Sequence, residues 1–323
     1  MSLIFDEGSD LDDIRERINS DDAAMRRVAV MDLIDYSGDE EAGELAVQGL
    51  SDTDAQVRIE SAKVLDEFEG ESVVAALLLA LEDTNETVRE TVAETLSEVR
   101  DKSAGPAIFK RFEDDDAFVK ASCLRVLRDM RLDESKKIAL DSLNHADARV
   151  RLEAVGVLAY LKNEEMLPAL INTASKDSDP NVRKIAVGSL IFSKTEQAAN
   201  ALEKALSDEN WQVREEAALI LGKVGVVSAV PSLIDAMDDE FWQVKVKAAN
   251  SLGKLKDESA VDALGQALTF SISNLRKEAA AALGEIASPA GIPFLEAISS
   301  DIDPDVRKIA QWAIEQINNK IEV

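Results

Sequence analysis

A short pattern returns along this chain at a nearly constant spacing, and that spacing limits the possible folds more than any other feature. A Val-Arg pair, or a close relative of it, occurs ten times in steps of 31 residues, with two steps of 32. The pairs begin at Met25, Val57, Val88, Val119, Val150, Val182, Val213, Val244, Leu275 and Val306. Self-similarity at a fixed period in this range is typical of solenoids, in which each repeat packs only on its neighbours.

Each repeat predicts two helices. A small residue follows the Val by four positions and a Leu follows it by eight, as in Val57, Ser61 and Leu65, so the three side chains share one buried helix face. A short polar residue lies three positions before the Val, where a helix N-cap belongs. The expected caps are Asp22, Asp54, Asn85, Asp116, Asp147, Asp179, Asn210 and Asp303. A second helix follows after a short turn, so an α-solenoid is predicted.

The pattern resembles the HEAT repeat, in the short form shared with phycobilisome (bilin) lyase subunits. Its closest forms are the segments 179–183 and 303–307, Asp-Pro-Asn-Val-Arg and Asp-Pro-Asp-Val-Arg. The resemblance covers roughly residues 20–320 and implies an all-α, right-handed superhelical array of about ten repeats. HEAT arrays serve as scaffolds, chaperones, lyase subunits and a few enzymes, so the resemblance implies a fold more than a function.

The array predicts a simple domain organisation. Residues 1–19 are expected to hold an N-terminal capping helix with Leu11, Ile14 and Ile18 on its apolar face, and residues 20–323 to form one elongated domain. The start of the chain lacks a basic region followed by an apolar one, and the longest apolar run, Val73 to Leu81, is too short to span a bilayer. A cytoplasmic protein is the default expectation.

Charge narrows the classes of partner. The net charge is -27, and residues 1–100 alone contain 27 acidic and 8 basic residues. Such a field repels phosphate backbones and anionic lipid, so it disfavours nucleic acid and membrane surfaces and favours a protein partner with a basic face. The alternative is that the charge serves only to keep a long, thin array soluble.

No residue is predicted to be catalytic, to bind a cofactor or to bind a metal. His145 is the only histidine, so no His cluster or Ser-His-Asp arrangement can form, and it is interpreted as a solvated turn residue. Cys123 occupies the small-residue column and is expected to be a buried, inert thiol. The HEAT-like deoxyhypusine hydroxylase binds di-iron through His-Glu motifs, which this chain lacks. A non-enzyme is expected.

The basic column that follows the Val column has two interpretations. A row of Arg and Lys could bind nucleic acid, but most members have an Asp or Asn four residues earlier. A ladder of Arg–carboxylate contacts that ties the turns together is the more economical interpretation. A second polar column runs along the second helices, and we expect it to face the concave groove. Its members are Gln48, Lys110, Asp141, Asn172, Lys204, Asp235, Gln266 and Glu296, with Leu79 as the apolar exception.

The largest departure from the repeat lies in repeats 7 to 9. Trp211 and Trp242 stand where other repeats have Pro180 and Pro304, and they are expected about 10 Å apart along one ridge. Hydrophobic residues also replace polar ones nearby. Phe241 and Ile272 stand at N-cap positions, and Phe270 replaces an acid that recurs at Asp52, Asp83, Asp114, Asp177, Asp208 and Asp239. Either these side chains form a partner-binding surface or they pack in the seams between repeats.

The sequence therefore predicts a non-catalytic scaffold, adaptor or maturation factor that holds a protein partner. Its predicted partner-binding residues are Trp211, Phe241, Trp242, Phe270, Ile272 and Leu79. The partner is expected on the concave groove or on the aromatic ridge. Two alternatives stay open: a bilin-lyase-like subunit that acts on a phycobiliprotein chromophore, and an accessory protein for metal-cofactor assembly on a partner.

Overall fold

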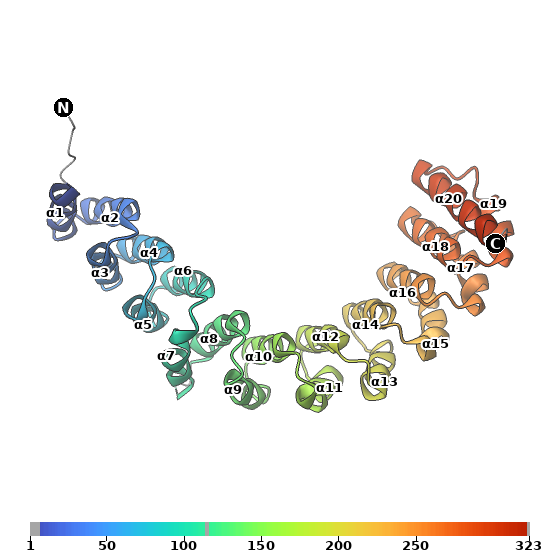
Figure 1. Cartoon of the computed structure of the whole chain (residues 1–323), viewed down its shortest axis with the longest axis horizontal. Coiled ribbons are helices and arrows are strands. Elements are labelled where there is room, and N and C mark those ends of the chain that lie inside the picture. The colour runs from blue at the N-terminus through green and yellow to red at the C-terminus, as the bar shows by residue number, and fades with distance from the viewer. Residues whose placement is uncertain (1–6, 114–115, 322–323) are drawn as a thin grey trace. The chain divides into compact units, whose positions relative to one another are not determined.

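The computed structural model describes residues 7–113 and 116–321, and in these ranges every regular element is a helix. The chain divides into two compact units, residues 1–161 and 162–323, which we call the N-terminal part and the C-terminal part. Each part is a stack of helix pairs (Figure 1). The predicted all-α solenoid is confirmed. Residues 1–6 of the predicted capping segment lie outside the described ranges.

The N-terminal part contains helices α1 to α10. Helix α1 (Glu7–Ile18) buries Leu11, Ile14 and Ile18 at the start of the stack. The first helices of repeats 1 to 5 are α2 (Ala23–Asp32), α4 (Ala55–Val64), α6 (Glu86–Ser97), α8 (Ala117–Met130) and α10 (Ala148–Leu161). The second helices of repeats 1 to 4 are α3 (Glu40–Gly49), α5 (Glu71–Ala80), α7 (Gly105–Lys110) and α9 (Ser135–Ser142).

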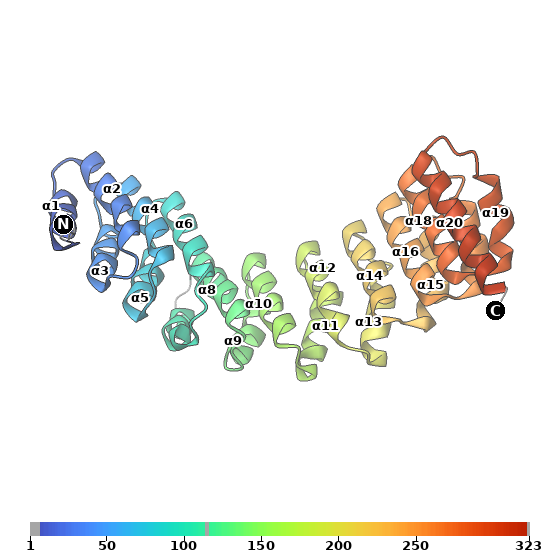
Figure 2. The same ribbon diagram turned by 45° about the horizontal axis from the view of Figure 1, so that its top comes forward.

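The C-terminal part continues the same alternation. It begins with α11 (Leu167–Lys176), the second helix of repeat 5. The first helices that follow are α12 (Pro180–Ser189), α14 (Trp211–Val224), α16 (Trp242–Leu255), α18 (Ser273–Ile286) and α20 (Pro304–Ile321). Their second helices are α13 (Glu196–Ala205), α15 (Val230–Asp235), α17 (Val261–Ala267) and α19 (Ile292–Ala297). First and second helices form two separate rows (Figure 2).

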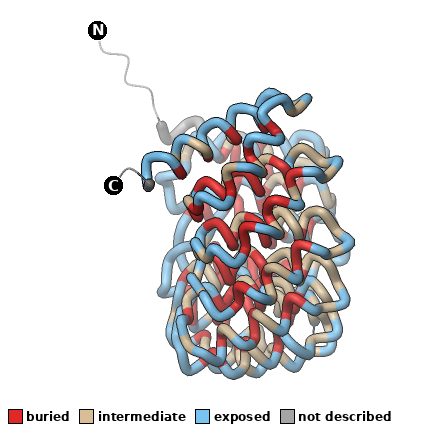
Figure 3. Tube along the Cα trace, turned by 90° about the vertical axis from the view of Figure 1, so that its right-hand side faces the viewer, coloured by how far each residue is buried: buried red, intermediate tan, exposed pale blue. Residues whose placement is uncertain are grey.

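The core of each part lies between its two rows of helices. The Val column is 0–1% exposed from Val57 to Val306, and the Leu column is equally buried from Leu33 to Leu283. Figure 3 shows that buried segments lie toward the inside of the stacked helices and exposed segments on the outside. Met25 is a correction to the predicted stripe, because it is 46% exposed. The helix packed on this side of α2 is α1, which buries its own Leu11, Ile14 and Ile18 but leaves the side chain of Met25 open to solvent.

The predicted N-caps form as expected. The side chain of Asp54 accepts hydrogen bonds from the backbone N–H groups of Gln56 and Val57, and the same arrangement recurs at the other Asp and Asn caps. Phe241 and Ile272 have the extended backbone of an N-cap but supply no side-chain bond. Two neighbouring helices therefore begin without a cap that usually contributes about 1 kcal/mol.

The polar column of the second helices does not face a concave groove in the C-terminal part, so that expectation is wrong there. The row of first helices lies on the inner side of the curve that these helices follow (Figure 1). Glycines explain the tight inner row: a Cβ at Gly253 would lie 2.8 Å from the Cα of Ala282, and one at Gly284 2.8 Å from the Cα of Ala313. First helices approach closely at these positions, and the second helices are left on the outer side.

Candidate partner-binding surface

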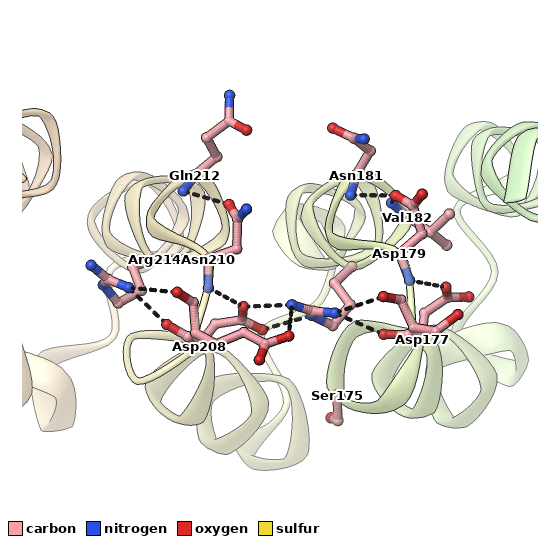
Figure 4. A network of polar contacts seen from close by, with 12 residues as sticks. Ser175, Asp177, Asp179, Asn181, Val182, Asp208, Asn210, Gln212 and Arg214 are labelled. Atoms are coloured by element: carbon pink, nitrogen blue, oxygen red, sulfur yellow. Dashed lines mark hydrogen bonds and ion pairs between the residues drawn. The ribbon is translucent and has the colours of Figure 1, made fainter.

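A ladder of arginines connects consecutive turns within each part. In repeat 6, Arg183 Nε and Nη2 each lie 2.8 Å from an oxygen of Asp208, and Nη1 donates to the backbone carbonyl of Asp177 at 2.9 Å. Asp208 also accepts from the backbone N–H of Asn210, as Figure 4 shows. The same fork joins Arg26 to Asp52, Arg58 to Asp83, Arg214 to Asp239 and Arg276 to Asp301.

The ladder was predicted, but with the wrong acid. The sequence suggested the N-cap residue four positions before each Arg, whereas the structure uses the acid at the turn of the following repeat. The N-cap side chain is already occupied by backbone N–H groups of its own helix. The Arg side chains are only 7–13% exposed and are bound to carboxylates of the chain itself. These arginines therefore stabilise the turns and do not form an exposed basic stripe that could bind nucleic acid.

The carboxylates of the ladder are held in their ionised form. The hydrogen bond from Arg26 lowers the pKa of Asp52, and the hydrogen bond from Arg276 lowers the pKa of Asp301. At the N-cap of α10, Arg149 lowers the pKa of Asp147 to about 2. Each of these groups is an ionised hydrogen-bond acceptor near neutral pH, as its bonds to guanidinium and backbone N–H groups require.

Two repeats replace the Arg–Asp pair of the ladder with other residues. Repeat 8 has Lys245 in place of Arg, and the next turn has Phe270 in place of Asp; Lys245 Nζ lies 4.9 Å from the centre of the Phe270 ring. Repeat 4 has Lys120, and the next turn has His145, whose Nδ1 accepts the Asp147 backbone N–H at 3.0 Å. His145 therefore makes the turn bond that an Asp makes elsewhere, and it is half-buried, not fully solvated.

The aromatic side chains of repeats 7 and 8 meet across the seam between the repeats. Trp211 stacks on Phe241 with ring centres 5.4 Å apart and an angle of 13° between the planes. The guanidinium group of Arg214 also lies over the Phe241 ring, with its Cζ atom 5.7 Å from the ring centre. Phe118 in repeat 4 has a similar contact with Arg89, at 5.7 Å. Phe241 and Phe270 thus contact side chains of the preceding repeat. These contacts agree with the interpretation that the aromatic residues pack in the seams between repeats.

The five predicted residues of this region are nevertheless all partly accessible. Trp211, Phe241, Trp242, Phe270 and Ile272 are all half-buried, so part of each residue is accessible to solvent. We call these five residues the aromatic surface. Leu79 is not part of it: this residue lies on α5 in the N-terminal part, where it is 66% exposed.

A hollow adjoins the aromatic surface. It has a volume of about 360 Å³ and is lined by Phe270 and Lys245 together with residues of α15, the following 3-10 turn (Ala236–Asp238) and α17. Ile234 and Met237 contribute apolar lining, and Asp238 and Asp262 contribute carboxylates. A partly exposed aromatic edge beside a hollow with acidic groups suits an apolar or basic side chain of a protein partner.

Sequence reasoning missed one exposed apolar region. Met25, Val28, Met31 and Ile34 on α2 and the turn after it are 45–48% exposed. The periodic pattern placed Met25 in a buried column, and nothing in the spacing marked the other three. The available signal was the replacement of residues that are polar in several other repeats, such as Glu60 and Glu216 at the position of Val28.

The remaining candidates for chemistry are structural. Cys123 is fully buried in the small-residue column, as predicted. Among the described residues, no group of three His, Cys, Asp or Glu side chains is arranged to hold a metal ion. No helix in the described ranges combines the length and the apolar character that crossing a membrane requires.

Comparison with known proteins supports the fold. The family described as HEAT repeats matches residues 43–128, 136–222, 192–245 and 230–315. No curated protein matches the chain. An engineered protein of known structure aligns over 96% of this chain and 99% of its own, with 22% identity and a TM-score of 0.52. YibA of E. coli aligns over 88% and 95%, with 20% identity and a TM-score of 0.52.

A longer array is also similar. A chain in the structure of Kap95p bound to RanGDP aligns over 95% of this chain and 49% of its own, with 16% identity and a TM-score of 0.65. At such identities these likenesses concern the fold alone.

Proposed function

Because the chain belongs to the HEAT-repeat family, we propose that it is a non-catalytic protein that binds another protein, as a scaffold, adaptor or maturation factor. The aromatic surface of repeats 7 to 9 is the proposed binding site. The related array in the Kap95p structure is itself in a complex with another protein, RanGDP, which is consistent with this class of function.

One observation carries the proposal: two adjacent helices begin with apolar residues where a cap would stabilise them. Phe241 and Ile272 each replace a residue that would contribute about 1 kcal/mol to helix stability. The contact between Phe241 and Trp211 offsets part of this cost in repeat 8, whereas the side chain of Ile272 supplies no cap bond to α18. Apolar residues retained against stability at a partly exposed position are typical of binding sites.

The test compares the partners of wild type and Trp211→Ala/Trp242→Ala in a quantitative pull-down from native cell extract. Trp312→Ala is the matched control, because Trp312 is the third tryptophan and is 38% exposed on α20. Circular dichroism and melting temperature first establish that each variant is folded. A partner identified this way is then purified and titrated against the three proteins.

We expect the double variant to bind that partner with a Kd at least about tenfold higher than wild type, because loss of aromatic anchors has such effects in other interfaces. The Trp312 variant is expected to bind like wild type. Equal binding by a folded double variant would assign Trp211 and Trp242 to seam packing alone. Leu79 on α5 would then be the next residue to change.

A further inference from the structure

Helix α2 carries an apolar stripe that the fold does not use. Met25, Val28 and Met31 are 46%, 46% and 45% exposed, and Ile34 in the 3-10 turn that follows is 48% exposed. Residues three positions apart are neighbours on a helix surface, so these side chains form a row that winds around the exposed side of α2, and we call this row the stripe. Four of the eleven large apolar side chains that are exposed among the described residues fall within this single segment.

The repeat itself does not require the stripe. At the position of Val28 the other repeats have residues such as Glu60, Glu153 and Glu216, and at the position of Met31 repeat 8 has Asn250. Polar side chains therefore satisfy these positions in several repeats, although repeat 6 has Ile185 at the position of Val28 and repeat 7 has Leu219 at the position of Met31. Large exposed apolar side chains that gather at one place mark an interaction site more often than isolated ones do.

Acidic groups surround the stripe. Asp21 and Asp35 are exposed at its two ends, and residues 1–100 contain 27 acidic against 8 basic residues. Of the two arginines on α2, Arg26 is bound to Asp52, which leaves Arg27 as the exposed basic group of that helix. The stripe thus has an acidic group at each end and one exposed basic group beside it, within a segment whose net charge is strongly negative.

We propose that the stripe on α2 docks a basic amphipathic helix of a partner protein. Such a helix presents apolar anchors at positions i, i+3 or i+4 and i+7, with Lys and Arg on either side, which complements both the apolar centre and the acidic surroundings. Methionine adapts its shape to different anchors, and two of the four residues are Met. A second copy of this chain fits poorly, because symmetric contact would bring two strongly acidic segments together.

This inference extends the proposed function by giving the chemistry of one partner, and it uses residues of a different part from the aromatic surface. The probe is a fluorescent peptide of about 18 residues of Leu and Lys, with the leucines on one helical face. Its binding to the full chain is measured by anisotropy. A peptide of the same composition with the leucines dispersed controls for charge.

Val28→Ser/Met31→Ser is expected to raise the Kd of the amphipathic peptide by about tenfold, since it removes two apolar contacts. Asp21→Asn/Asp35→Asn is expected to raise the Kd by about threefold at low salt and less at high salt. Ile185→Ser/Ile191→Ser, which removes apolar side chains of similar exposure in the C-terminal part, is expected to bind like wild type. Trp211→Ala/Trp242→Ala should also leave this Kd unchanged, so the two proposals fail independently.

Circular dichroism confirms that each variant is folded before the comparison. Equal Kd values for wild type and Val28→Ser/Met31→Ser would overturn the proposal, because binding would then be diffuse attraction to the acidic surface. It would also fail if the dispersed peptide bound as tightly as the amphipathic one. Sedimentation measures the oligomeric state of wild type and of Val28→Ser/Met31→Ser. If wild type is a dimer and the variant is a monomer, a second copy of the chain occupies the stripe and the proposal of a basic partner helix is wrong.

Discussion

At the scale of single residues, the turns of this array are held by pairs of residues that change together. Arg is matched by Asp in the next turn at Arg183–Asp208, whereas Lys245 is matched by Phe270. A guanidinium binds a carboxylate through two parallel bonds, and an ammonium cannot reproduce that geometry. Lysine over an aromatic ring is a different way to close the seam.

This pairing predicts coupling between Lys245 and Phe270. We expect Phe270→Asp alone to lower the free energy of unfolding, because it replaces a packed ring with a carboxylate that Lys holds less well. Adding Lys245→Arg should restore the ladder and recover about 1–3 kcal/mol of that loss. Urea unfolding of the four proteins of the cycle measures the coupling. Additive effects would show that the two residues do not act as a pair.

A substitution at Ile272 is expected to change stability and partner binding in opposite directions. Its backbone already has N-cap geometry, and Asn fills the same position at Asn85 and Asn210. Ile272→Asn is therefore expected to raise the free energy of unfolding by about 1 kcal/mol. If the aromatic surface binds a partner, the same substitution raises the Kd for that partner in a titration. A variant that is more stable and binds unchanged would remove Ile272 from the site.

At the scale of helices, glycines determine how closely neighbouring first helices pack. Gly253→Ala is expected to lower the free energy of unfolding by about 1–2 kcal/mol, because overpacking against the backbone of Ala282 outweighs the gain in helix propensity. Gly38→Ala is the matched control: no heavy atom lies within 4 Å of its added Cβ, so it should be neutral or slightly stabilising. Chemical denaturation of both variants decides the matter, and equal effects would contradict a packing role for Gly253.

The elements were largely predictable from the sequence, because the same helix signals occur ten times. Apart from Met25, the Val and Leu columns lie where the spacing placed them, and so do the Asp caps and the first-helix positions of Pro180 and Pro304. Contacts between repeats were less predictable. The acid that each Arg binds lies about 25 residues along the chain, and the partner of Trp211 is Phe241 of the next repeat, so both depend on how the repeats stack.

Exposure was the hardest property to predict. Met25 occupies a position that is buried in the other repeats, yet it is 46% exposed, because its exposure depends on the helix packed beside it and not on its place in the repeat. The side of the curve on which the polar column lies depends on how closely the first helices approach at Gly253 and Gly284. These are properties of the stack, and a single repeat does not contain them.

At the scale of the whole molecule, acid stability follows from carboxylates of the ladder. Arg276 lowers the pKa of Asp301 in the folded chain, while the unfolded pKa is about 3.9. A folded pKa below the unfolded one favours the ionised, folded form. The resulting stability is complete above about pH 4 and is lost as the pH falls through the folded pKa.

We therefore expect Asp301→Asn to be less stable than wild type at pH 7, and the difference between the two proteins to close as the pH falls below about 4. Comparing the two proteins largely cancels the effect of the overall charge, because that charge changes with pH in nearly the same way in both. Asp66→Asn, which changes an exposed carboxyl outside the ladder, should track wild type at every pH. Urea midpoints across this range measure the effect. A difference that persisted undiminished at low pH would mean that Asp301 stabilises the turn by packing and not through its charge.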